Sequence, residues 1–277
     1  MVGRTGPREQ RRNGRGGNRI ASAALVPLSL VCLCTGALIA ESIVSAGTAY
    51  EDLALETIRD ADADESDADR AGAVDADAGD QGEGDAQDVD WGALLGINAD
   101  TVAWLSVEGT SIDHPVVQPA DGVDADWYLT HSFWGEPSSA GCLYLDARAG
   151  ADGTHQLVYG HHLGWTDQMF SEIFQTYEQE VFDTVGQARW STPEGGTTVY
   201  EPVMALSVDK TYAAIQQFEF EDAEALRAWL MEIEAEATAR ADDAETLIDG
   251  ATRVLTLVTC SSVTGGQRAR TLLVFVA

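Results

Sequence analysis

From about residue 101 onward the chain consists of short apolar runs separated by turn-forming residues, and this pattern constrains the fold more than any other feature. Many of the runs are rich in Val, Leu and Tyr, the residue types that strands prefer. Eight short strands with few helices between them predict a mostly β fold, a closed or nearly closed β-barrel. The predicted strands are Ala103–Val107, His114–Gln118, Gly141–Leu145, Gln156–Tyr159, Ala188–Ser191, Thr197–Ser207, Arg253–Val258 and Thr271–Val276.

Three helices are predicted to accompany the barrel. A short helix lies on its N-terminal side and ends at the turn Asn98-Ala99-Asp100-Thr101. Two longer segments carry apolar residues at helical spacing, Gln168–Thr184 and Phe220–Arg240, and Asp222 can cap the second of them. The apolar positions are Met169, Ile173, Phe174, Tyr177 and Val181 in the first segment and Leu226, Trp229, Leu230, Ile233 and Ala237 in the second.

Residues 20–40 form an uncharged, mostly apolar stretch that follows an arginine-rich tail of residues 1–19. Roughly 20 apolar residues are needed to span the hydrocarbon core, whereas the apolar part of a cleaved signal peptide has only about 7–15. The stretch therefore predicts a retained transmembrane anchor, although Val44-Ser45-Ala46 also fits a cleavage site. The basic tail before the anchor and the acidic run after it predict a cytoplasmic N-terminus and an extracellular remainder.

Much of the formal net charge of −30 lies in the segment 41–90, where only Arg59 and Arg70 are basic. Low hydrophobicity and high charge cannot offset chain entropy, so we expect an acidic, largely disordered spacer over residues 41–88, above all over Asp60–Gln87. A short helix is expected in Glu51–Asp60, and the folded domain is expected to cover residues 89–277. An acidic chain is unsuited to nucleic acids, because contact with phosphates needs Lys and Arg.

Cys260 stands where an apolar strand gives way to small polar residues. Rigid scaffolds present reactive groups at such strand ends, but buried inert cysteines are common, so this position alone leaves a working thiol and a packed cysteine equally open. Of the other cysteines, Cys32 and Cys34 lie in the predicted anchor and Cys142 lies in the folded domain. Because that domain is predicted to face an oxidising compartment, a disulfide between Cys142 and Cys260 is an alternative.

A second strand runs into Gly160-His161-His162. Neighbouring residues of a strand point to opposite faces, and neither an HExxH motif nor a paired-cysteine spacing accompanies the two histidines. We therefore expect no metal site. The remaining histidines, His114, His131 and His155, are isolated in the sequence.

Two arginines, Arg268 and Arg270, precede the last strand. If that strand pairs with the strand that ends at Cys260, Arg270 lies near the thiol. A guanidinium group is permanently charged, and it can hold a substrate carbonyl and stabilise the oxyanion that forms when the carbonyl is attacked. Arg268 is better explained as a surface charge that offsets acidic neighbours.

Together these features resemble the sortase family. The pentapeptide Thr256–Cys260 is similar to the TLxTC signature, and the Gly-His pair upstream and the Arg downstream follow in the order that the family shows. The stretches Trp104–Arg148 and Tyr159–Tyr177 and the long helix before the Cys strand resemble class B most closely. The resemblance covers about Val89–Ala277 and implies an eight-stranded sortase-type barrel.

The resemblance also implies roles for individual residues. Cys260 is the nucleophile, His161 the acid/base partner and Arg270 the clamp on the oxyanion or substrate. His161 is preferred to its neighbour because it directly follows Gly160. A contribution to substrate binding is assigned to Thr259, Ser262 and His162.

The function that this resemblance implies is that of a membrane-anchored cysteine transpeptidase of a Gram-positive-type envelope, with no cofactor. The enzyme would cleave a C-terminal sorting signal of a secreted protein after Thr and form a thioester on Cys260. It would then transfer the protein to an amine of the cell-wall precursor or of a pilin. Two alternatives are a Cys-His hydrolase that releases proteins and a non-catalytic, membrane-tethered β-barrel binding module in which Cys142 and Cys260 form a disulfide.

Overall fold

The structure is a computed structural model that describes residues 47–59, 88–164, 166–260 and 268–277. The basic tail, the predicted anchor 20–40 and residues 60–87 of the predicted spacer lie outside the described residues. Among the helices in the described ranges, none is both long and apolar enough to cross a membrane.

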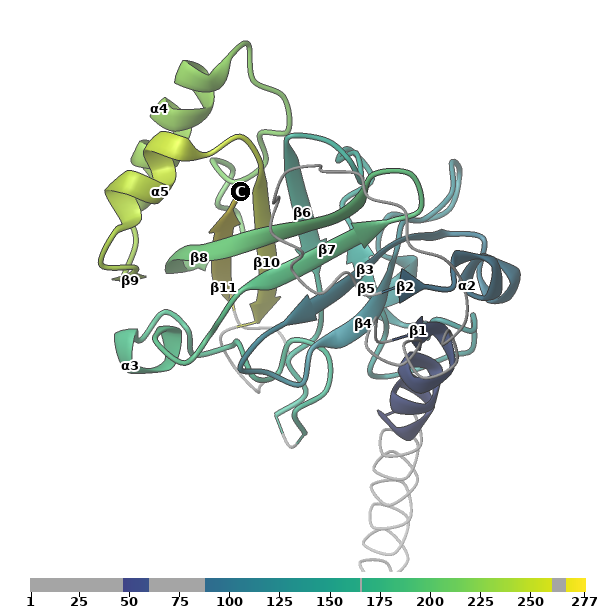
Figure 1. The fold of residues 1–277 in the computed structure, drawn as a ribbon. Coiled ribbons are helices and arrows are strands. Elements are labelled where there is room, and N and C mark those ends of the chain that lie inside the picture. Colours follow the sequence, from purple (N-terminus) through teal and green to yellow (C-terminus); the bar gives the residue numbers. More distant parts are fainter. Residues whose placement is uncertain (1–46, 60–87, 165, 261–267) are drawn as a thin grey trace, which may run out of the picture. The chain divides into compact units, whose positions relative to one another are not determined.

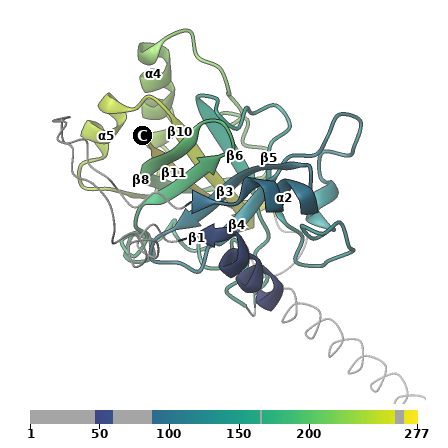
Figure 2. The same ribbon diagram turned by 45° about the vertical axis from the view of Figure 1, so that its right-hand side comes forward.

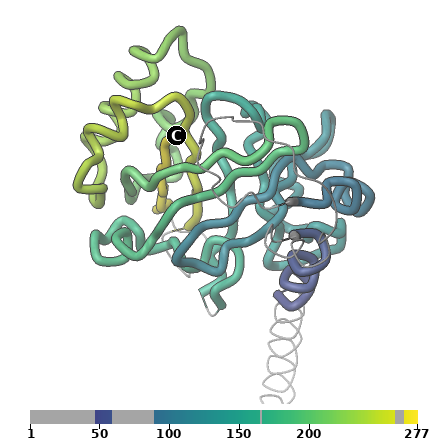
Figure 3. The backbone as a smooth tube through the Cα atoms, in the orientation of Figure 1, coloured from purple at the N-terminus to yellow at the C-terminus, as the bar shows by residue number. Residues whose placement is uncertain are grey.

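Eight strands pair side by side in the order β11-β10-β6-β5-β4-β3-β7-β8, and an additional pairing of β8 with β11 closes the barrel. Figure 3 follows this closure along the backbone, with the yellow C-terminal segment beside the green segment of β8. The bounds are β3 Thr101–Val107, β4 Asp113–Val117, β5 Leu143–Leu145, β6 His155–Tyr159, β7 Ala188–Thr192, β8 Gly196–Asp209, β10 Val254–Cys260 and β11 Ala269–Val276.

The prediction of an eight-stranded barrel is confirmed, and each predicted strand is present with shifted ends. The shift that matters for the site is in β10, which continues through Cys260 instead of stopping at Val258. A further short strand, β9 (Ala239–Arg240), pairs with β8 and extends the sheet, and the sequence pattern does not predict it.

Side chains along the strands alternate between the barrel interior and an outer layer, as the pleat requires. On β10, Leu255 and Leu257 belong to the interior cluster, whereas Val254 and Val258 belong to a second cluster outside the barrel. Two helices, α4 (Ala223–Glu234) and α5 (Ala244–Gly250), pack on this outer cluster. They lie together on one side of the barrel in Figures 1 and 2.

The helix predicted over Phe220–Arg240 is confirmed in its first part as α4. The Asp222 carboxylate caps it by accepting a hydrogen bond of 2.9 Å from a backbone N–H of the first turn. The helix ends at Glu234 because the chain then enters β9, where the Thr238 N–H donates to the Ala205 carbonyl on β8. Four residues of the predicted apolar stripe are buried on α4, Leu226, Trp229, Leu230 and Ile233, and each such side chain contributes roughly 1.5–3 kcal/mol. The fifth, Ala237, lies beyond the end of the helix and is half-buried.

The helix predicted over Gln168–Thr184 is wrong for most of its length. Only α3 (Gln179–Phe182) is an α-helix, and the residues before it form successive turns. Met169 has a φ of 57°, in the left-handed region that an α-helix excludes, and the Thr176 N–H bonds only three residues back, to Ile173. The apolar spacing therefore reflects burial in this turn-rich segment, since Met169 and Ile173 are 1% and 0% exposed.

Residues 47–57 form a helix that packs on the domain, although they lie within the predicted spacer. Tyr50 and Leu53 are 1% and 4% exposed on one face of this helix, whereas Leu55 on another face is 83% exposed. The folded domain thus includes residues N-terminal to the predicted boundary at residue 89.

Two very short strands, β1 (Ile58–Arg59) and β2 (Asp88–Val89), pair antiparallel just after this helix. β2 leads directly into α2 (Trp91–Ile97), the predicted helix on the N-terminal side of the barrel, which is confirmed. The Asp90 carboxylate caps α2, and the Asp90 N–H donates to the Thr57 carbonyl at 2.7 Å. The helix at residues 47–57 is therefore fastened to the domain at its C-terminal end.

Candidate active site

Cys260 is the last residue of β10, and β10 lies between β6 and β11 in the sheet. On one side, the antiparallel register with β11 places Cys260 directly opposite Arg270. On the other side β6 runs parallel to β10, and the Gly160 N–H donates to the Val258 carbonyl at 3.1 Å. His161 follows immediately, so the three residues meet at one end of the sheet, the lower end of β10 in Figure 1.

The side chain of Cys260 belongs to the outer face of the sheet. Val258, two residues earlier, packs in the outer cluster, and residues two apart on a strand share a face. Cys260 is only half-buried. A thiol at the end of a rigid strand that solvent can reach suits a nucleophile.

Cys142 differs from Cys260 in its surroundings. It is 2% exposed, and burial raises the pKa of its thiol to about 12, so it stays protonated at neutral pH. Both cysteines are free. The alternative of a binding module with a disulfide between Cys142 and Cys260 is therefore wrong.

The imidazole of His161 is held by a backbone carbonyl. Its Nε2 lies 2.7 Å from the carbonyl oxygen of Leu129, the last residue of a 3₁₀ turn, η2 (Trp127–Leu129). A carbonyl only accepts, so Nε2 carries the hydrogen and Nδ1 is the nitrogen left to exchange a proton. Gly141 lies against the ring, because a Cβ at this position would stand 3.2 Å from Cδ2 of His161.

His162 contacts the nucleophile strand. Its Nδ1 lies 3.2 Å from the carbonyl oxygen of Cys260, and its ring stacks on Phe174 with 3.9 Å between the ring centroids. Desolvation lowers the pKa of His162, and the Cys260 carbonyl partly opposes that shift. The neutral ring, with the hydrogen on Nδ1, therefore ties the end of β10 to the turn-rich segment after the His loop.

The two arginines differ in their partners. Arg268 forms an exposed ion pair with Asp209, with distances of 2.7 and 2.9 Å between nitrogens and carboxylate oxygens. Arg270 donates to the Ala269 carbonyl at 3.0 Å and is half-buried. Burial raises the pKa of Tyr144 on β5, and the charge of Arg270 acts in the opposite direction, so the guanidinium lies within electrostatic range of that hydroxyl.

Thr259, one of the residues assigned to substrate binding, is 2% exposed, and its hydroxyl has no hydrogen-bond partner among the described residues. It follows Leu257 on the interior face of the barrel, so we give it a packing role. Ser262 lies outside the described residues.

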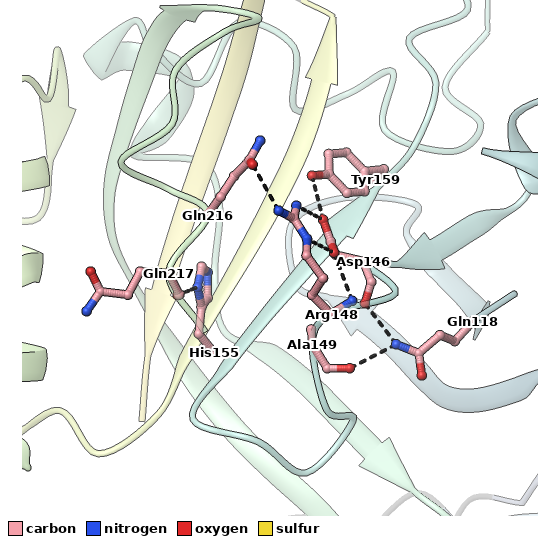
Figure 4. Close-up of polar contacts among 8 residues, drawn as sticks. All are labelled: Gln118, Asp146, Arg148, Ala149, His155, Tyr159, Gln216 and Gln217. Atoms are coloured by element: carbon pink, nitrogen blue, oxygen red, sulfur yellow. Dashed lines mark hydrogen bonds and ion pairs between the residues drawn. The ribbon is translucent and has the colours of Figure 1, made fainter. Parts of the chain in front are cut away.

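A charged cluster beside the site fastens the segment between β8 and α4 to the sheet (Figure 4). Arg148 pairs with both carboxylate oxygens of Asp146, with Nε 2.8 Å and Nη2 2.7 Å away, and Tyr159 on β6 donates to the same carboxylate at 3.1 Å. Arg148 also donates to Gln216 at 3.1 Å and lies 5.0 Å from the ring centroid of Phe218. The sequence pattern gives no indication of this cluster.

The buried histidine His155 secures the same segment from inside. Its Nδ1 donates to the Gln217 carbonyl at 2.7 Å (Figure 4). Its Nε2 accepts from the Thr256 hydroxyl at 2.9 Å. Burial lowers the pKa of His155 to about 4, so the ring is neutral at physiological pH. Burial has the same effect on His114. Within the described ranges, no group of three or more His, Cys, Asp or Glu side chains is arranged to hold a metal ion.

Comparison with known proteins gives consistent matches. Sortase B of Listeria monocytogenes is 24% identical over 176 residues, 63% of this chain and 68% of the relative. The crystal structure of Clostridium perfringens sortase B has a TM-score of 0.57 at 29% identity, covering 67% of this chain and 97% of that one. Staphylococcus aureus sortase B in complex with its substrate has a TM-score of 0.57 at 22% identity, covering 68% of this chain and 83% of that one. At this level of identity the match supports a shared fold and nothing more. No protein-family model matches the chain.

The barrel and these relatives together define a cysteine transpeptidase of the sortase family, to which the chain belongs. The Listeria monocytogenes and Clostridium perfringens relatives are both sortase B. The chain is accordingly a class B sortase.

Proposed function

We propose that this sortase is membrane-anchored and joins secreted proteins to an amine at the outer face of the cell membrane. One observation carries the proposal: the strand register sets Arg270 directly opposite Cys260, and His161 follows the strand on the other side. Staphylococcus aureus sortase B has been solved with its substrate, and it shares this fold. A sorting signal near the C-terminus of a secreted protein is the substrate that we propose here.

In the first half-reaction the Cys260 thiolate attacks the carbonyl carbon of a Thr in the signal. A carbon–sulfur bond forms, and the carbonyl oxygen takes up negative charge that Arg270 stabilises. The carbon–nitrogen bond then breaks, and His161 protonates the departing amine from Nδ1. The product is a thioester between Cys260 and the Thr carbonyl.

In the second half-reaction an amine of the cell-wall precursor or of a pilin attacks the thioester carbon. His161 takes a proton from that amine, the carbon–sulfur bond breaks, and the Cys260 thiolate is restored. The thioester retains the free energy of the original peptide bond, so a new amide forms without ATP or a cofactor. Water in place of the amine would give hydrolysis instead.

The location of the site is part of the proposal. Residues 20–40 would hold the chain in the membrane, and the acidic segment that follows would keep the domain at its outer surface. Both the secreted protein and a lipid-linked acceptor emerge there, which favours a tethered enzyme over a diffusing one.

The test is incubation of the full chain with a library of short signal peptides, with and without added amines, followed by mass spectrometry. We expect an amide product between the acyl fragment and the amine, cut after Thr. Hydrolysis with every amine would show that the enzyme releases proteins instead. If no peptide is cleaved by a protein with a titratable Cys260 thiol, the proposal is wrong.

A further inference from the structure

The helix at residues 47–57 bears on the site through one side chain, Tyr50. Tyr50 is 1% exposed, and its hydroxyl accepts a hydrogen bond of 3.1 Å from the Phe133 N–H and approaches the Gly141 carbonyl at 3.4 Å. Phe133 and Gly141 belong to the segment 128–142. The helical residues 47–57, which follow the predicted anchor in the sequence, thus contact a loop of the catalytic domain.

The segment 128–142 is also the segment that holds His161. The Leu129 carbonyl accepts the hydrogen bond from Nε2 of His161, and the Cys142 N–H donates to the Tyr128 carbonyl at 2.9 Å. Gly141 has a φ of +66°, and a Cβ there would stand 2.6 Å from the Tyr128 carbonyl oxygen. The two ends of the segment are therefore in close contact at the point where the imidazole rests.

The surroundings of Tyr50 restrict its movement. Its ring meets His114 edge-on at 5.1 Å between centroids and lies 5.0 Å from Trp134. Burial raises the pKa of Tyr50 well above the ordinary tyrosine value, so the hydroxyl stays protonated and can donate as well as accept. The pairing of β1 with β2 and the bond from the Asp90 N–H fix the end of the same helix.

From this geometry we infer that Tyr50 is a positioning residue for the catalytic His161, acting through the backbone of Phe133 and Gly141. The inference rests on the proposed function, because it gives His161 the role of proton carrier. It makes the helix next to the predicted anchor a part of the active site. A change in how this helix docks would reach the imidazole across one loop, without any contact between the helix and the substrate.

The test uses the full chain, purified in mild detergent with its histidines labelled at Cε1, and the variant Tyr50→Phe. The substitution keeps the ring and removes the hydroxyl. The matched control is Tyr212→Phe, because the Tyr212 hydroxyl donates to the exposed Glu236 at 3.4 Å, its one hydrogen bond among the described residues. The readouts are the NMR titration of His161, and kcat and KM for peptide cleavage.

We expect Tyr50→Phe to shift the His161 titration. The value of kcat should fall by about tenfold at constant KM, less than the roughly 100-fold that a 1 Å misplacement can cost. Tyr212→Phe should match the wild type in all readouts. The inference is overturned if the His161 titration of Tyr50→Phe equals that of the wild type, whether or not activity falls.

A second variant keeps the inference testable if Tyr50→Phe does not fold. Leu53→Ala weakens the docking of the same helix through packing alone and should shift the His161 titration in the same direction. An unchanged titration in a folded Leu53→Ala protein would equally overturn the inference. Since the titration needs no substrate, a wild-type protein without transpeptidation would refute the proposed function and leave this test intact.

Discussion

At the scale of single residues, the site depends on one cysteine, one histidine and one of two neighbouring arginines. Sequence reasoning selects Arg270 over Arg268 by position alone. The structure adds a physical distinction, because Arg268 is engaged with the exposed Asp209 while Arg270 stands opposite Cys260. The same distinction supplies matched variants for the roles that we propose.

The first prediction concerns the nucleophile. Cys260→Ala should abolish turnover and leave the fold intact, because the side chain is half-buried at a strand end and fills little of the core. Product formation by mass spectrometry and thermal unfolding measure the two parts. Residual turnover would assign the chemistry to another group, and Cys142→Ala is the control that should keep activity.

The second prediction compares the arginines. Arg270→Lys should lower kcat by about 100-fold, the size of effect seen when one oxyanion-hole donor is lost, because a point charge does not replace a planar fork. Arg268→Lys should stay near the wild type, since its ion pair with Asp209 is exposed. Steady-state kinetics measure kcat for both variants. A larger loss of kcat in Arg268→Lys than in Arg270→Lys would assign the oxyanion clamp to Arg268.

The third prediction concerns His162, for which the structure indicates a role in holding the strand end. His162→Asn keeps a donor for the Cys260 carbonyl, whereas His162→Phe keeps the stacking on Phe174 and removes the donor. Loss of a hydrogen bond of about 1 kcal/mol corresponds to roughly a fivefold fall in kcat for the Phe variant. Equal rates for the two variants would contradict this role.

At the scale of elements, the strands were easier to predict than the segments around them. The strands carry continuous apolar runs bounded by turn residues, and these signals are local. The segment after the His loop has apolar residues at helical spacing, yet it forms turns. Met169 has a left-handed backbone, and the Phe174 carbonyl accepts a hydrogen bond from the Thr271 hydroxyl on β11. Such tertiary contacts do not appear in a local pattern.

The residues of the candidate site also differ in how well the sequence predicts them. Cys260, His161 and Arg270 are predictable because each stands at a strand boundary, and the register that unites them follows from strand pairing. The supports of the site are not predictable. Tyr50 lies in an acidic stretch that suggests a spacer, and the Leu129 carbonyl carries no side-chain signature at all.

The fourth prediction belongs to the cluster of Asp146 and Arg148. Burial raises the pKa of Asp146, and the hydrogen bonds and charge of Arg148 more than reverse this, so the pKa lies below its ordinary value. A carboxyl group with a depressed pKa in the folded state stabilises the protein above its unfolded pKa of about 3.9 and loses this contribution as the pH falls through the folded value.

Asp146→Asn should therefore lower the free energy of unfolding by roughly 1–2 kcal/mol at pH 7, with the half-exposed Arg148 limiting the effect. The difference between variant and wild type should shrink below about pH 4. Urea unfolding at both pH values measures it. A difference that stays constant with pH would show that the ionised carboxylate is not what holds the cluster together.

At the scale of the whole molecule, the anchor that we propose would determine where the enzyme works. We predict that the full chain remains with the membrane fraction after alkaline extraction, whereas a chain that begins at residue 43 is released. Mass measurement of the membrane-bound protein also tests for cleavage after Ala46. A full chain found in the soluble fraction would refute the anchor.

The position of β10 and β11 in the chain bears on when the proposed active site is completed during synthesis. They are the last strands of the barrel in sequence order, yet one carries Cys260 and the other both carries Arg270 and closes the barrel against β8. If the chain is exported as we propose, its histidine loop would emerge before the Cys260 thiol. Reactivity would then arise only when export has delivered the final strands, so an unfinished molecule could not couple itself to its neighbours.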